Sequence, residues 1–182
     1  MKLEWINEMK KTRRLKLSFT GYLTHYLIVL LLFIPFILVL FDFFRFYVLD
    51  SYDGVRTLQE LLRATLPFAA IGVLFSFIQY RRLRFQIIET VLPRKELQEI
   101  IIKTAEELEW LPVINRADII LSKTNPSWWT GSWGEQITIL FDKDKLLINS
   151  ICDPEKKASV LSFGRNKRNV TKLAENIENA SR

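Results

Sequence analysis

Positions 22–41 read YLTHYLIVLLLFIPFILVLF, twenty residues without a charged side chain. At a rise of about 1.5 Å per residue, a helix of this length spans about 30 Å, the thickness of the hydrocarbon core of a bilayer. A helix in the core of a soluble protein needs only one apolar stripe, so an unbroken apolar run is not required there. The run therefore predicts a transmembrane helix, with Pro35 at a kink that such a helix tolerates.

A second apolar segment, ATLPFAAIGVLFSFIQY, occupies positions 64–80. Seventeen residues are close to the lower limit for a membrane span. Pro67 falls in the first turn of this segment, where proline does not break a helix. We expect two antiparallel transmembrane helices, about 22–41 and 64–80, within a hairpin that occupies residues 21–84.

The basic residues predict the orientation of this hairpin. Residues 1–20 contain six Lys or Arg, and Arg81, Arg82 and Arg84 directly follow the second span. The loop 42–63 contains three Arg and four acidic residues. Because Lys and Arg are enriched on the cytoplasmic side, both termini are predicted to be cytoplasmic in a bacterial inner (plasma) membrane.

Residues 1–20 form a basic N-terminal segment with some amphipathic character. Leu3, Ile6 and Met9 recur on one side, and Lys10 and Lys11 follow them. One interpretation is a short interfacial helix with its apolar side on lipid and its cations near anionic headgroups. The other is an ordinary positive flank of the first span.

The remaining residues, 85–182, are enough for one small domain. Helical spacing of apolar residues predicts helices over 94–110 and 166–179. Alternation predicts a hairpin of strands at 136–141 and 145–152, a strand within 113–124, and a further short strand at 158–163. The fold class expected is therefore a membrane protein with a two-helix hairpin and a cytosolic α+β domain, in which three to four antiparallel strands lie between two helices in two layers.

Composition restricts the class of function. The net charge of +6 arises mostly in the N-terminal segment, whereas residues 94–182 contain 14 basic and 13 acidic residues. A nearly neutral domain argues against nucleic-acid binding. The single cysteine, Cys152, excludes an intramolecular disulfide, as is usual for a cytosolic domain.

No pattern predicts catalysis, a cofactor or a metal site. The only histidine, His25, lies in the first predicted span and is interpreted as an interfacial polar residue. Cys152 precedes Asp153 and lacks a histidine as base, which favours a structural thiol. Asp142 and Asp144 flank a lysine where turn geometry selects aspartate. The protein is therefore expected not to be an enzyme.

Three of the five tryptophans, Trp128, Trp129 and Trp133, lie within six residues. They occur in a glycine-containing loop between the predicted strands. The loop either packs as a lid on the domain or anchors a protein partner or the membrane interface.

Three cations, Arg165, Lys167 and Arg168, surround the start of the last helix. Cations oppose the helix dipole at that end, so they do not stabilise the helix. Together with free backbone N–H groups they are candidates for binding an anion or a lipid headgroup. The alternative is a solvated basic face.

These observations lead to two functional hypotheses. The first is a non-enzymatic accessory or scaffold subunit of a membrane complex, which binds a protein partner or another copy of itself through the cytosolic domain. The alternative is a membrane-tethered regulatory domain that binds anionic lipid. The sequence supports no cofactor and no nucleic-acid partner.

Overall fold

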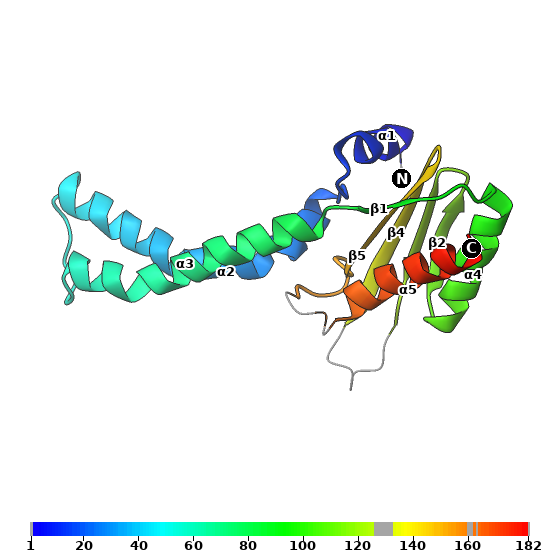
Figure 1. Ribbon diagram of the computed structural model, residues 1–182. Coiled ribbons are helices and arrows are strands. Elements are labelled where there is room, and N and C mark those ends of the chain that lie inside the picture. The colour runs from blue at the N-terminus through cyan, green and yellow to red at the C-terminus, as the bar shows by residue number, and fades with distance from the viewer. Residues whose placement is uncertain (1, 126–132, 160–161, 163, 182) are drawn as a thin grey trace.

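The computed structural model describes residues 2–125, 133–159, 162 and 164–181. Two long helices, α2 (Phe19–Tyr47) and α3 (Leu58–Arg82), form a hairpin that projects away from a five-stranded sheet (Figure 1). Ser18 accepts a hydrogen bond from the Gly21 backbone at the start of α2, and Thr57 and Glu60 form a reciprocal capping box at the start of α3.

Both hairpin helices are long and apolar enough to cross a membrane. They contain the two predicted spans and extend beyond them at both ends. Only 11% and 6% of the residues in their most apolar windows are buried within the protein. A helix in a soluble core would bury its apolar side chains, so these helices leave a large apolar surface without a protein cover.

The two helices are held together near the sheet by a pair of reciprocal hydrogen bonds. Gln79 Nε2 donates to the carbonyl oxygen of His25 at 2.6 Å, and His25 Nε2 lies 3.2 Å from the carbonyl oxygen of Gln79. Both side chains are buried. His25 was interpreted as an interfacial polar residue. Its hydrogen-bond partner, Gln79, lies 54 positions along the chain, so it could not be found in the segment that contains His25.

The sheet is antiparallel and has the order β1-β5-β4-β3-β2. Its strands are β1 (Gln86–Glu89), β2 (Leu111–Arg116), β3 (Ile119–Lys123), β4 (Glu135–Asp142) and β5 (Lys145–Cys152). The predicted hairpin of β4 and β5 is confirmed.

The predicted number of three to four strands is wrong. Strand β1 adds to the sheet ahead of the first helix of the domain, and the segment predicted as one strand is the hairpin of β2 and β3. Ala158, Ser159 and Ser162 are not in a strand, and residues 160, 161 and 163 of that predicted strand lie outside the described residues.

One face of the sheet is covered by α4 (Arg94–Glu107) and α5 (Arg165–Ala180), as Figure 1 shows. Both helices were predicted, with ends that differ by at most three residues. Ile137, Ile139 and Phe141 of β4 point to this face, as their alternation in the sequence indicates. They pack with Ile101 of α4 and other apolar residues in one core.

The opposite face is covered in part by α1 (Leu3–Thr12). Ile6 and Met9 are buried against it, with Leu140 and Leu147 of the sheet, whereas Leu3 remains exposed. In one of the two interpretations of this segment its apolar side lies on lipid, but Ile6 and Met9 of that side are turned towards protein. The reason is that Leu140 and Leu147 make the second sheet face apolar too, so the domain has a third layer.

Three residues, 83–85, connect α3 to β1. Leu83 and Phe85 are buried. The Leu15 N–H donates to the Leu83 carbonyl oxygen, and the Phe85 N–H donates to the Arg13 carbonyl oxygen. The connection is thereby paired with the segment that leads from α1 to α2. Asn149 of β5 donates to the carbonyl oxygens of Arg82 at 2.8 Å and Arg84 at 3.0 Å. These contacts fix the sheet to the end of the hairpin.

Candidate functional site

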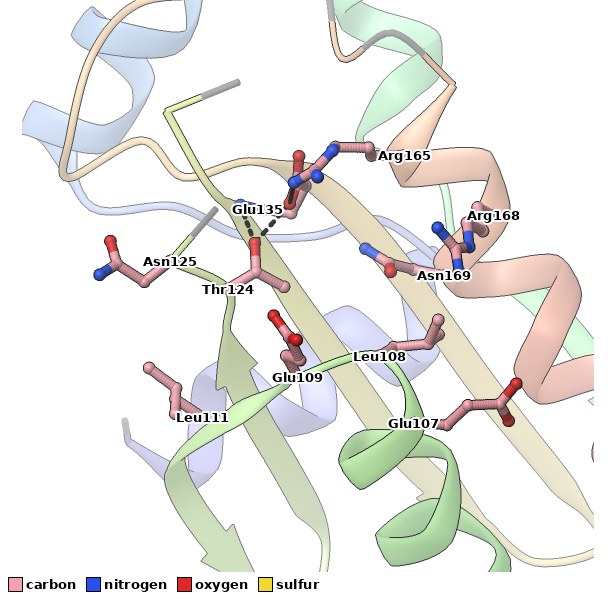
Figure 2. Close-up of a pocket in the computed structure, with 10 residues that line it drawn as sticks. All are labelled: Glu107, Leu108, Glu109, Leu111, Thr124, Asn125, Glu135, Arg165, Arg168 and Asn169. Atoms are coloured by element: carbon pink, nitrogen blue, oxygen red, sulfur yellow. Dashed lines mark hydrogen bonds and ion pairs between the residues drawn. The ribbon is translucent and has the colours of Figure 1, made fainter. Parts of the chain in front are cut away.

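An open cleft of about 620 Å³ lies where β3, β4, the end of α4 and the start of α5 meet (Figure 2). Its polar lining comes from four separate segments of the sequence. The lining residues are Glu107, Leu108, Glu109, Leu111, Thr124, Asn125, Glu135, Arg165, Arg168 and Asn169. Three carboxylates and two guanidinium groups therefore face one space.

Glu135 is the buried acid of this cleft, with 1% of its surface exposed. The Thr124 hydroxyl donates a short hydrogen bond to its Oε2 atom, and Arg165 Nη1 lies 3.8 Å from the same oxygen. Thr124 also accepts a hydrogen bond from the Glu135 backbone at 2.8 Å. A buried carboxylate is costly without such partners, so these contacts hold Glu135 at the inner wall of the cleft.

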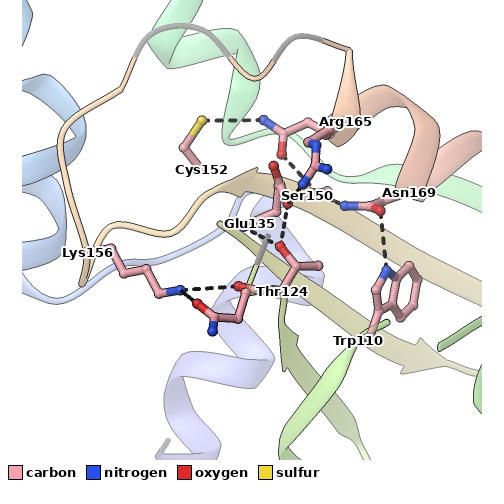
Figure 3. A network of polar contacts seen from close by, with 10 residues as sticks. Trp110, Thr124, Glu135, Ser150, Cys152, Lys156, Arg165 and Asn169 are labelled. Carbon is pink, nitrogen blue, oxygen red and sulfur yellow. Dashed lines mark hydrogen bonds and ion pairs between the residues drawn. The ribbon is translucent and has the colours of Figure 1, made fainter. Parts of the chain in front are cut away.

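A chain of buried polar groups continues from the cleft between α5 and the sheet, as Figure 3 shows. The Trp110 indole N–H donates to Asn169 Oδ1 at 3.3 Å, and Asn169 Nδ2 donates to Ser150 Oγ at 3.0 Å. Ser150 Oγ in turn donates to Asn166 Oδ1 at 3.1 Å. This chain fixes the rotation of the first two turns of α5, and thereby the positions of Arg165 and Arg168.

Charge pairs are formed by Glu107, which lines the cleft, and by Lys123, which precedes the lining residue Thr124. Lys172 hydrogen-bonds Glu107 and keeps the pKa of that carboxyl below its ordinary value. On the other side of β3, burial of Lys123 lowers its pKa, but hydrogen bonds to Glu155 and to Asp153 outweigh burial and raise it above the ordinary value. Lys123 Nζ lies 2.5 Å from Glu155 and 3.1 Å from Asp153.

Asn125, which precedes the predicted tryptophan loop, lines this cleft. Trp128 and Trp129 lie outside the described residues, so neither of the two interpretations of the loop is tested for them. Trp133 is half exposed, and Lys157 Nζ lies 3.7 Å from the centre of its ring. Gly134 follows with a φ of +113°, where a Cβ atom would lie 2.6 Å from the Thr124 carbonyl oxygen, so glycine is required there.

The three cations at the start of α5 do not converge. Arg165 and Arg168 line the cleft, whereas Lys167 lines a second groove of about 260 Å³ between α5, β5 and the end of α3. Successive helical residues point about 100° apart, so neighbours in sequence reach different spaces. The predicted set of Arg165, Lys167 and Arg168 is therefore divided between two sites.

The other residues weighed in the sequence lie away from an evident reactive centre. The Cys152 thiol is partly buried and lies 3.9 Å from Asn166 Nδ2. Asp142 and Asp144 flank Lys143 in the turn between β4 and β5, where Lys143 has a φ of +53°. Across the part of the chain that the structure describes, no three His, Cys, Asp or Glu residues are grouped to hold a metal ion.

Sequence reasoning missed Glu135, Thr124 and Asn169 as members of the cleft. Thr124 directly follows β3 and Glu135 begins β4, the next strand in the chain. This order is a signal that the two residues lie at the same end of adjacent antiparallel strands. Asn169 carries no comparable signal, because a single asparagine in an amphipathic helix is common at the boundary of its polar face.

No protein-family model, curated protein or solved structure matches this chain. Its site is therefore interpreted from its own geometry.

Proposed function

We propose that this chain is an integral membrane protein of the bacterial inner membrane. The supporting observation is the apolar surface of α2 and α3, which the protein itself does not cover. The basic residues at both inner ends of the hairpin favour cytoplasmic termini and a short extracytoplasmic loop around Ser51. The sheet and its helices then lie in the cytoplasm against the membrane surface.

Cysteine accessibility tests this topology. Cys152→Ser removes the only cysteine, and Ser51→Cys or Ser181→Cys then adds one at an exposed position. We expect a membrane-impermeant maleimide to label the Ser51→Cys protein in spheroplasts, and the Ser181→Cys protein only after lysis. Labelling of both before lysis, or release of the protein by carbonate, would contradict the proposal.

In the membrane, the protein acts as a non-enzymatic accessory subunit that binds a protein partner in the cleft. The observation that carries this proposal is the cleft itself, which is lined by charges of both signs. The half-exposed Trp133 lies two residues before Glu135 in the chain. Arginine and tryptophan are enriched among the residues that contribute most to protein interfaces. Carboxylates and guanidinium groups together suit a polypeptide segment that carries both signs of charge, since each can pair with its opposite.

Site-specific photo-crosslinking in native membranes tests the partner proposal. A photoreactive phenylalanine analogue in place of Trp133 should yield one crosslinked protein species, and the analogue in place of Val91, which is fully exposed, should not yield it. Adding Arg168→Glu should reduce that species about tenfold or more, because it reverses one charge of the cleft.

Lys143→Glu is the matched control for this change. It makes the same charge reversal at an exposed turn at the other end of β4, so the crosslinked species should persist. If Arg168→Glu and Lys143→Glu reduced the crosslinked species equally, the cleft would be excluded as the binding site. The same conclusion would follow if the analogue at position 91 gave the same crosslinked species.

A further inference from the structure

The second groove differs from the cleft in its charge. Four cations, Arg81, Arg82, Arg84 and Lys167, line it, and its lining contains no acidic residue. None of the four forms an ion pair with a carboxylate in the described part of the chain. Four unneutralised cations around one concave surface repel one another, so the groove attracts an anion.

Neutral polar side chains in the groove add hydrogen-bond donors for a bound anion. Ser150 and Asn166 line its wall beside Lys167, but the Ser150 hydroxyl already donates to Asn166 Oδ1. The neutral side chains of the lining that can donate to a ligand are therefore Gln86, at the start of β1, and Thr171 of α5. The backbone of the arginine segment is held by Asn149, so the groove does not depend on a flexible tail. Fixed cations with neutral donors between them are the usual recognition chemistry of a phosphate group.

The groove also lies at the end of the apolar hairpin. Phe77 and Tyr80 of α3 are about half exposed, and Arg81 follows directly. Aromatic side chains of this kind occupy the headgroup level of a membrane, and an adjacent cluster of cations between helices is where anionic headgroups bind. A positive flank alone explains the three arginines, but it does not explain Lys167, which comes from the far end of the chain.

We propose that this groove is a binding site for a phosphate group, presented by an anionic phospholipid headgroup or by a soluble phosphate. The position of the groove favours the lipid, and that part of the inference rests on the membrane location proposed above. A protein that is recovered in the membrane fraction but binds no phosphate would contradict this inference and leave the proposed function standing.

Native mass spectrometry of the full chain in neutral detergent tests the lipid arm, with phosphatidylglycerol added and phosphatidylcholine as the reference. We expect one phosphatidylglycerol molecule to be retained in preference to phosphatidylcholine. Arg84→Gln with Lys167→Gln should weaken its binding about 25-fold, at roughly fivefold for each cation. The second arm measures thermal stabilisation by inorganic phosphate in the same detergent, with the same variant.

The matched control is Lys143→Gln with Arg168→Gln. It removes the same charge from two exposed positions, one of them next to Lys167 but lining the other cleft. Loss of binding in Arg84→Gln/Lys167→Gln but not in the control supports the groove as the binding site. Loss of phosphatidylglycerol binding identifies a lipid as the source of the phosphate, and loss of stabilisation by inorganic phosphate identifies a soluble source. No binding in either arm, or equal weakening in both variants, would overturn the proposal, because equal weakening means general attraction of a basic protein to anions.

Discussion

Met9→Ala should lower the free energy of unfolding of the domain by about 2–5 kcal/mol, the usual cost of removing a fully buried methionine side chain. Met9 is 0% exposed and packs between α1 and the second face of the sheet. The cost combines lost burial with the cavity left against Leu140 and Leu147, which rigid strands fill only in part.

Leu3→Ala is the control for this prediction, because Leu3 lies on the same helix and is 62% exposed. Its effect should remain within about 0.5 kcal/mol. Urea unfolding followed by tryptophan fluorescence measures both, since all five tryptophans lie outside α2 and α3 and report on the domain alone. Equal midpoints for the two variants would mean that α1 is not part of the core and that the lipid-facing interpretation should be restored.

Asn149→Leu should destabilise the junction between the hairpin and the sheet by about 2–4 kcal/mol. The change removes the donor to the Arg82 and Arg84 carbonyl oxygens. Both hydrogen bonds are part-buried, so each oxygen left without this donor costs about 1–2 kcal/mol, the lower part of the usual range. Leucine has the same branching at Cγ as asparagine, so the change leaves no cavity and removes the hydrogen bonds.

Hydrogen exchange of the detergent-solubilised protein measures the destabilisation of this junction. The backbone amides of residues 83–88, which form the junction, report on it. Those amides should exchange faster in Asn149→Leu, while the amides of α4 should change less. Asn115→Leu, in the exposed strand β2, is the matched control and should leave residues 83–88 unchanged. Unchanged exchange in Asn149→Leu would show that the two hydrogen bonds do not hold the junction.

The elements that could be predicted from the sequence are those with long regular patterns. The apolar runs of α2 and α3 and the alternation of Ile137, Ile139 and Phe141 are each independent of tertiary context. Strand β1 has only four residues and is half exposed, so its pattern is too short to recognise. The turn between β2 and β3 contains Ala117 and Asp118 without glycine or proline, and its weak signal merged two strands into one.

The sites were predictable only in part, for a related reason. The sequence identified Arg165, Lys167 and Arg168 as a group because they are neighbours, whereas the fold separates them by the helical rotation between successive residues. The contact of Arg165 with Glu135, 30 positions away, depends on how α5 docks on the sheet. The same holds for Lys167 and the arginines at the end of α3.

The edges of the sheet determine how another chain can approach it. The outer strand β2 includes Pro112, which has no N–H to donate, and its register with β3 shifts between Pro112 and Ile114. At the other edge, β1 offers only four residues. Short or proline-containing edges resist the addition of a foreign strand. Recognition by backbone pairing is therefore disfavoured at both edges, and the partner proposed for this domain would have to be selected by its side chains.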